Sequence, residues 1–194
     1  MKSHQRVRSM LIGAGLVLAV TALSPLAMAG SMDATGPVMV GGAAMLPSKN
    51  IVQNAVNSKD HTTLVAAVKA AGLVDTLSGP GPFTVFAPTN EAFAALPAGT
   101  VDSLLKPENK ASLVKILTYH VVPGRLTARD LSMKTAAGGG KAELKTVQGE
   151  TLTVSKEGDS WAVTDSKGNT AHVTIGDVVQ SNGVIHVVDK VLMP

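Results

Sequence analysis

Hydrophobic positions in the first half of the chain recur every three to four residues, which is the spacing of an amphipathic helix. Residues 51–56, 64–71 and 113–120 each carry such an apolar stripe. Gly72 fits the C-terminal end of a helix, and Pro107 fits the first position of another. Side chains that can cap a helix start precede several of these segments, namely Ser48, Asp60, Thr89 and Thr127. This half therefore predicts several short helices.

The second half changes to short β-rich runs that are separated by turn residues. Asn182-Gly183 stands between the last two runs, and this pair favours a hairpin because both residues tolerate positive φ. The final run alternates poorly between apolar and polar residues, which is typical of a strand buried on both faces. The expected strands are 142–147, 151–154, 161–164, 171–175 and 184–192.

One further strand is expected among the helices, at residues 83–87, and Pro88 ends it. All three phenylalanines lie between Phe83 and Phe93. Because aromatic side chains bury large areas, this concentration predicts the centre of the core. Helices followed by a mostly antiparallel β body, tied together by this strand, indicate a single-domain α+β fold.

The N-terminus has the three parts of a secretory signal. Lys2, Arg6 and Arg8 form a basic start, and residues 10–23 form an apolar run that is too short to span a bilayer comfortably. Ala27-Met28-Ala29 supplies a cleavage pattern of small residues. We therefore expect export to the periplasm or out of the cell.

This interpretation divides the chain into a signal peptide at 1–29, a linker or N-terminal arm at 30–47, and one domain at 48–194. The arm is rich in Gly, Ala, Met and Pro. Two roles for its methionines stay open. Their thioethers could bind copper(I), or they could be adaptable apolar contacts. The residues concerned are Met32, Met39 and Met45.

Removing the signal makes the chain electrically neutral. The full sequence has 17 Lys plus Arg and 14 Asp plus Glu, and three of the basic residues but no acidic one lie in 1–29. A neutral chain without a basic cluster has no electrostatic reason to bind nucleic acid. Without cysteine there is no disulfide framework, so stability must come from apolar burial. We expect no transmembrane segment after the signal.

Three segments carry the most specific pattern in the sequence. They run from Thr84 to Phe93, from Tyr119 to Val122, and from Asn182 to Asp189. Each joins an apolar strand to a turn or a helix start, and their order and spacing resemble the fasciclin domain, as found in small secreted bacterial proteins. The resemblance extends over 51–194. It implies a wedge of mostly antiparallel strands with several helices, and a role in cell adhesion or protein interaction.

The resemblance also implies a partner-binding site. In animal relatives, integrin contact is associated with the tyrosine–histidine segment and with an Asp-Ile pair just before the last segment. The matching residues here are Tyr119, His120, Asp177 and Val178. Asp-Val replaces Asp-Ile, and a bacterium has no integrins, so the expected partner is another surface or matrix protein, or a glycan.

Structural roles are open for the same residues. The hydroxyl of Tyr119 could anchor the loop after its helix, although an aromatic ring with a polar tip also suits an interface. Asp177 follows Gly176, and its carboxylate could cap the backbone of the next turn.

Candidate metal ligands are few. His120, His172 and His186 would form a zinc site only if they converged, and no pair has ligand spacing on one helix. The alternative is that His120 hydrogen-bonds a backbone carbonyl in the core, while His186 points into solvent or a polar pocket. The aspartates lack the clustered spacing of a calcium loop. We expect no metal and no cofactor.

Catalytic patterns find no support in the sequence. There is no cysteine and no Gly-x-Ser-x-Gly motif, and Gly138-Gly139-Gly140 lacks the lysine and Ser/Thr of a phosphate loop. The sequence therefore predicts an exported, non-enzymatic interaction module. The alternative is a periplasmic small-molecule or lipid-binding protein, which the 45% content of hydrophobic residues favours.

Overall fold

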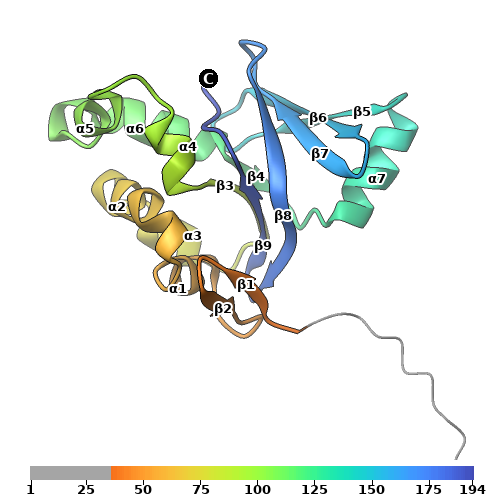
Figure 1. Ribbon diagram of the computed structural model, residues 1–194, viewed down its shortest axis with the longest axis horizontal. Helices are drawn as coiled ribbons and strands as arrows, with labels where there is room; N and C mark the ends of the chain where they lie inside the picture. The colour runs from red at the N-terminus through yellow and green to blue at the C-terminus, as the bar shows by residue number, and fades with distance from the viewer. Residues whose placement is uncertain (1–35) are drawn as a thin grey trace, which may run out of the picture. The chain divides into compact units, whose positions relative to one another are not determined.

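The computed structural model describes residues 36–194. The predicted signal peptide and Met32 lie outside the described residues. Within the described range, seven α-helices and two short 3₁₀ helices accompany a seven-stranded sheet and a small hairpin (Figure 1). The helices are α1 (Ile51–Ala55), η1 (Lys59–His61), α2 (Thr62–Ala71), α3 (Val74–Ser78), α4 (Asn90–Ala94), α5 (Thr100–Leu104), η2 (Pro107–Asn109), α6 (Lys110–Tyr119) and α7 (Ala128–Ala137).

The sheet confirms the predicted α+β fold with mostly antiparallel strands. Its order is β4-β3-β9-β8-β7-β6-β5, and only β3 and β9 pair in parallel. The sheet is nearly closed, because the backbone N–H of Val147, just after β5, donates to the Val121 carbonyl of β4 at 2.8 Å. The strands are β3 (Phe83–Pro88), β4 (Val121–Pro123), β5 (Lys141–Lys145), β6 (Thr151–Glu157), β7 (Ser160–Thr164), β8 (Thr170–Gln180) and β9 (Gly183–Val188).

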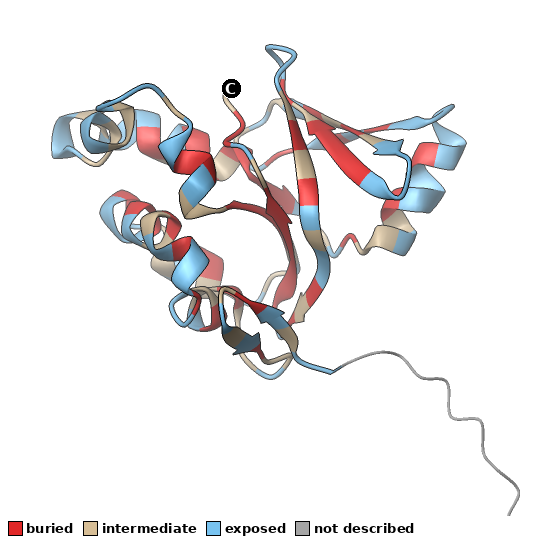
Figure 2. Ribbon diagram, viewed as in Figure 1, coloured by how far each residue is buried: buried red, intermediate tan, exposed pale blue. Residues whose placement is uncertain are grey.

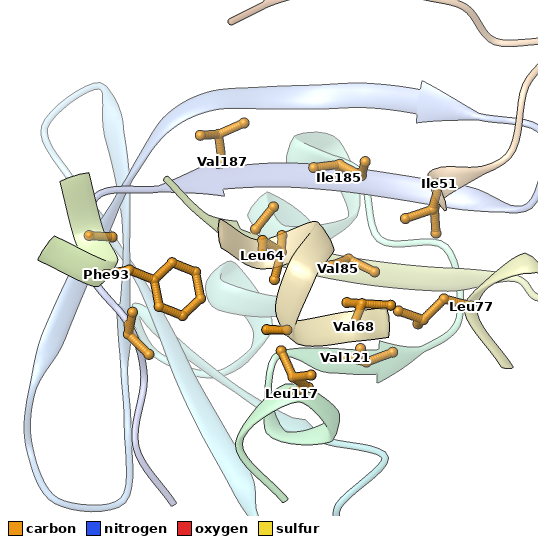
Figure 3. Close-up of a cluster of buried hydrophobic side chains, with 14 of the residues drawn as sticks. Ile51, Leu64, Val68, Leu77, Val85, Phe93, Leu117, Val121, Ile185 and Val187 are labelled. Atoms are coloured by element: carbon orange, nitrogen blue, oxygen red, sulfur yellow. The ribbon is translucent and has the colours of Figure 1, made fainter. Parts of the chain in front are cut away.

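Two cores lie on opposite faces of β3 and β9. Every residue of β9 is buried, as predicted for its apolar run (Figure 2). Side chains of the helix-side core lie between these strands and α1 to α4 and α6, as Figure 3 shows. We call the two groups the helix-side core, including Leu64, Val68, Val85, Phe93, Leu117 and Ile185, and the barrel-side core, including Phe86, Tyr119, Leu131, Leu152, Trp161 and Val188.

Several helix boundaries follow the sequence. Thr89 caps α4 by accepting the Ala92 N–H, and Thr127 caps α7 by accepting the Asp130 N–H. Gly72 ends α2 with φ 73°, a left-handed conformation that glycine adopts without strain.

Two predicted caps are wrong. Asn50, rather than Ser48, caps α1, because its side chain accepts the Gln53 N–H while the Gln53 side chain accepts the Asn50 N–H. Asp60 lies inside η1, and this extra turn separates it from the start of α2. A cap works only directly before the first helical residue, so a shift of one or two positions changes which side chain performs it.

The hairpin between β8 and β9 forms where it was predicted, but for a different reason. Its loop is Ser181-Asn182, and neither Asn182 nor Gly183 has positive φ. Gly183 is needed because a Cβ atom there would lie 2.0 Å from the Phe83 carbonyl oxygen. The Asn182 side chain accepts the Ile51 N–H and donates to the Leu77 carbonyl, so it joins the hairpin to α1 and α3.

The segment before α1 forms a hairpin of β1 (Val38–Val40) and β2 (Ala43–Met45). Val40 and Met45 enter the helix-side core, whereas Met39 is 59% exposed. Met39 and Met45 therefore do not converge on one ion. Buried Asn54 of α1 anchors the chain after β2, since it accepts the Leu46 N–H and donates to the Leu46 carbonyl.

Strand β8 is longer than its predicted range of 171–175. It continues to Gln180 through two shifts of register, the second between Ile175 and Val178. Asp177 lies in this irregular stretch with φ 55°, and it is the one non-glycine residue of positive φ among residues 36–194. The prediction that its carboxylate caps the backbone of a following turn is wrong, because the chain crosses a β-bulge and then resumes pairing.

Candidate functional site

Tyr119 is completely buried at the end of α6. Its hydroxyl accepts the Ser166 N–H at 2.9 Å and points its own hydrogen toward the Thr151 carbonyl at 3.4 Å. The hydroxyl therefore anchors the turn between β7 and β8, and the prediction that it holds the loop after its own helix is wrong. The partners lie 47 and 32 residues away, so no local pattern could identify them.

His120 is also buried, and it bonds a backbone carbonyl as one of the two sequence interpretations predicted. Its Nδ1 lies 2.9 Å from the Ile116 carbonyl oxygen, and its Nε2 accepts the Leu192 N–H at 3.0 Å. Nδ1 must therefore carry the hydrogen, which defines one neutral tautomer. Burial lowers the pKa of His120 to about 4, against smaller opposing effects of the Ile116 carbonyl and Asp165.

His186 is fully buried on β9, so the prediction that it points into solvent or a polar pocket is wrong. Its ring stacks on Phe86 with 5.7 Å between centroids. Nε2 donates to the Leu126 carbonyl at 2.7 Å, and Nδ1 accepts the Asp177 N–H at 3.3 Å. Because β9 is covered on both faces, any histidine on it must find partners inside the protein.

His172 lies apart from the other two histidines and is partly exposed. Its Nε2 is 3.3 Å from a Glu157 carboxylate oxygen, and its Nδ1 is 3.5 Å from Asp189. The three histidines therefore do not converge. Across residues 36–194, no three His, Asp or Glu side chains are placed to hold a metal ion.

Asp177 is the one predicted partner-binding residue with an exposed side chain. Its Oδ1 accepts the N–H of Ala128, the first residue of α7, at 2.6 Å. Its own N–H donates to His186 inside the protein. Val178, the next residue, is completely buried in the helix-side core. The bulge thus presents the carboxylate outward while its neighbour packs inward.

Other exposed residues belong to the two segments that the hydrogen bond between Ala128 and Asp177 joins. Thr174 and Gly176 precede Asp177 on β8, and Arg125 and Arg129 lie just before and within α7. Arg125 donates from Nη2 to the Gln180 carbonyl at 2.9 Å, which ties the segment before α7 to the end of β8. We call these four residues, together with Asp177, the bulge surface. The two arginines were not predicted, because they lie about 50 positions from Asp177 in the sequence.

Two small apolar spaces, which we call lobes because they share wall residues, lie within the helix-side core. The larger lobe has a volume of about 40 Å³ and the smaller lobe about 20 Å³. Both are lined by Ile51, Ala55, Leu64 and Val85. These lobes could not be predicted from the sequence, because they arise where short helices pack against the sheet.

Comparisons with known proteins agree with this architecture. The sequence model described as the fasciclin domain matches residues 59–194. Protein sll1483 of Synechocystis sp. is 48% identical over 189 residues, which cover 93% of this chain and 97% of the relative. The cell surface glycolipoprotein MPB83 of Mycobacterium bovis is 37% identical over 169 residues, covering 84% of this chain and 68% of the relative.

One solved structure shows the same fold. It is a FAS1 domain pair from the insect cell adhesion molecule fasciclin I, with a TM-score of 0.67 and 20% sequence identity. The match covers 77% of this chain and 52% of that chain, so this protein spans about half the length of the pair. Among residues 36–194, none of the helices is both long and apolar enough to cross a bilayer.

Proposed function

This chain belongs to the fasciclin domain family, and on that premise we propose that it is an exported, non-enzymatic interaction module. It acts in the periplasm or outside the cell, and it binds a surface or matrix protein, or a glycan, through the bulge surface. Two relatives support a role at surfaces, since one is named a cell surface glycolipoprotein and another structure comes from a cell adhesion molecule.

The observation that carries this proposal is the conformation of Asp177. Positive φ is uncommon outside glycine, and such backbone is often found where a side chain must be presented for function. Two hydrogen bonds hold Asp177 in this conformation, one from Ala128 and one to His186. A carboxylate fixed at the surface loses little entropy when a partner binds it.

The other predicted partner residues support this surface from within. Tyr119 and His120 fix the end of α6, and Val178 fixes the bulge through its packing. None of these three side chains reaches the surface. Their contribution to binding is therefore to hold the scaffold in shape.

The two buried histidines of the family segments, His120 and His186, are not available as general bases, which favours a non-enzymatic role. A general base needs a free nitrogen or oxygen within hydrogen-bond reach of a substrate. Both ring nitrogens of His120 and of His186 are already used inside the protein. Neither histidine can serve a substrate without breaking the fold around it.

The test is Asp177→Asn, which removes the charge but keeps an oxygen that can accept the Ala128 N–H. Asparagine also tolerates positive φ. The chain from Gly30 onward is immobilised, and partners captured from the envelope of its own cells are identified and titrated. We expect affinity to fall about tenfold or more, the size of one lost charge-assisted hydrogen bond, while Tm stays constant.

Asp159→Asn is the matched control, because Asp159 is an equally exposed carboxylate in the turn between β6 and β7. It should leave the affinity unchanged. Equal affinity of wild type and Asp177→Asn would contradict the bulge surface as the binding site. If both variants lower the affinity for the captured partner equally, the effect comes from negative charge in general and not from Asp177.

The alternative function, a periplasmic small-molecule or lipid-binding protein, has one specific observation in its favour. The two lobes lie in the helix-side core, and their walls are almost entirely aliphatic. Ligand sites for drug-sized molecules enclose about 300–1,000 Å³. The lobes are much smaller, so they favour a small molecule over a lipid.

A further inference from the structure

One buried side chain joins the two segments that form the bulge surface. His186 of β9 is completely buried, and each of its ring nitrogens makes a hydrogen bond. Nε2 lies 2.7 Å from the carbonyl oxygen of Leu126, in the segment before α7, and Nδ1 lies 3.3 Å from the backbone nitrogen of Asp177 on β8. The same two segments meet again at the surface, where Asp177 Oδ1 accepts the Ala128 N–H. The imidazole is therefore the internal link of this surface.

The N–H of Asp177 depends on this imidazole because the strand is irregular there. The pairing of β8 with β9 shifts register between Ile175 and Val178, which lie on either side of Asp177. At a bulge the extra residue is left out of the ladder, so its backbone groups need other partners. Asp177 also has φ 55°, a conformation that residues other than glycine seldom adopt. The bond to His186 helps to hold the chain in this conformation.

Only the neutral ring of His186 can make both bonds. A neutral imidazole has one N–H group and one acceptor nitrogen, and the Leu126 carbonyl requires the hydrogen on Nε2. Nδ1 is then the acceptor for the Asp177 N–H. A second proton would lie on Nδ1, so two N–H groups would face each other across 3.3 Å. The ring is fully buried and stacks on the uncharged ring of Phe86 of β3, so it cannot turn to another acceptor without displacing its neighbours.

The groups around the ring affect its protonation in opposite directions. Burial lowers the pKa of His186, and this is the largest effect. The Leu126 carbonyl and the Asp177 carboxylate raise the same pKa by smaller amounts. Arg125, which is next to Leu126 in the chain, directs its guanidinium to the Gln180 carbonyl. The buried ring is therefore neutral at pH 7, and a proton is favoured where the ring gains access to water.

We propose that His186 is an acid switch for the bulge surface. At neutral pH its two hydrogen bonds hold Asp177 in position. In acid, a proton on Nδ1 releases the Asp177 N–H, so the bulge opens and the carboxylate is no longer presented. This regulates the site proposed above, and its effect on a partner rests on that proposed function. The opening itself involves no partner, so it is measured separately.

The expected size of the effect follows from proton linkage. In the opened bulge His186 is exposed to water and has its ordinary pKa of 6.5, whereas burial lowers the pKa of the closed ring. The closed bulge is therefore fully favoured above pH 6.5, and it loses stability as the pH falls below that value. Until the lower pKa of the closed ring is reached, the equilibrium constant for opening rises by up to about tenfold per pH unit.

Amide hydrogen exchange, followed by NMR, tests the switch in the chain from Gly30 onward, which contains every described residue. From pH 7 to pH 5 we expect the protection factor of the Asp177 amide to fall about tenfold or more. The amide of Val154, in the middle of β6, should stay better protected than Asp177 throughout, because its exchange requires the sheet to unfold. At pH 7 the ¹⁵N signals of the His186 ring should show the hydrogen on Nε2.

Three variants identify the group that takes the proton. His186→Asn has no titrating ring but keeps an oxygen at the position of Nδ1 for the Asp177 N–H, so protection at residue 177 should no longer depend on pH. His120→Gln is the matched control, because it removes another buried histidine and should leave the pH dependence at residue 177 intact. The dependence should also persist in Asp177→Asn, since the carboxylate is not the titrating group.

Three results would overturn the switch. They are a constant protection factor at Asp177 from pH 7 to pH 5, equal protection factors at Asp177 and Val154, and a pH dependence that survives His186→Asn. The first two need only the unmodified chain, so they decide the matter even if a variant does not fold. Equal affinity of wild type and Asp177→Asn for the captured partner, with exchange as expected, would contradict the interaction function and leave the switch standing.

Discussion

The two faces of β3 and β9 carry cores of different character. On the barrel side, aromatic rings and long aliphatic side chains fill a nearly closed sheet, and the buried histidine His186 uses both ring nitrogens. On the helix side, valine, alanine and leucine predominate, two lobes remain, and the buried histidine His61 makes one side-chain hydrogen bond, to Ser58.

The difference arises from how each face is covered. Strands joined edge to edge fix their side chains at regular spacing, so large residues can interdigitate. Short helices cover the other face mainly with branched aliphatic side chains, and these leave two small spaces unfilled. The comparison shows that one fold can combine a half filled by aromatic and long aliphatic side chains with a half that retains small internal spaces.

Truncating one leucine side chain in each core should give the largest change in the free energy of unfolding. Leu152→Ala on β6 should lower the free energy of unfolding by about 4 kcal/mol. The site is fully buried in a nearly closed sheet, so the neighbouring side chains cannot move in to fill the space. Leu64→Ala should cost about 2 kcal/mol, since Leu64 already borders both lobes. Urea unfolding measures both. Equal losses would show that the two cores are packed equally well.

Replacing the two histidines sharpens the contrast. His186→Leu should cost about 2–3 kcal/mol, because it strands the Leu126 carbonyl and the Asp177 N–H. His61→Leu should cost less, about 1 kcal/mol, since the hydrogen bond to Ser58 is the one side-chain bond that it removes. Thermal unfolding of both variants measures this. A larger loss for His61→Leu than for His186→Leu would contradict this contrast.

Acid should weaken the fold through the buried histidines His120 and His186. Burial lowers the pKa of His120 from its ordinary 6.5 to about 4, and lowers that of His186. Below pH 6.5 the unfolded chain binds protons that the folded chain does not, so stability is complete above 6.5. It then falls toward pH 4, by up to about 1.4 kcal/mol per pH unit for each histidine.

Urea unfolding at intervals from pH 7 to pH 4.5 checks this dependence. The carboxylate of Asp165 near His120 and that of Asp177 near His186 oppose the lowering of the two histidine pKa values, but burial is the larger effect. His120→Gln should show a shallower slope than wild type. Stability that stays constant from pH 7 to pH 5 would contradict the assigned neutral tautomers.

A surface ion pair between the two halves should have the smallest effect. Lys115 of α6 lies 3.7 Å from Glu150, which is in the turn between β5 and β6, and both side chains are exposed. Lys115→Ala should change stability by less than about 0.5 kcal/mol. Lys106→Ala, which breaks a pair within the helix side, is the control. A loss above about 1 kcal/mol at Lys115 would mean that the halves depend on this link.

The sequence by itself determined the elements and their class. The spacing of hydrophobic residues distinguished helices from strands. The capping side chains of Thr89 and Thr127 and the conformational freedom of Gly72 predicted helix ends. The burial of β9 on both faces could also be read from its composition. These features depend on residues within one or two turns of each other, which is why the sequence shows them.

The tertiary structure alone decided how the candidate residues are used. The burial of Tyr119, the cap that Asp177 places on α7 and the pairing of His186 all depend on partners 9 to 60 residues away. Gly183 is required by a neighbouring strand rather than by its own φ. Burial and cavities are properties of packed surfaces, and a surface exists only after distant segments have met.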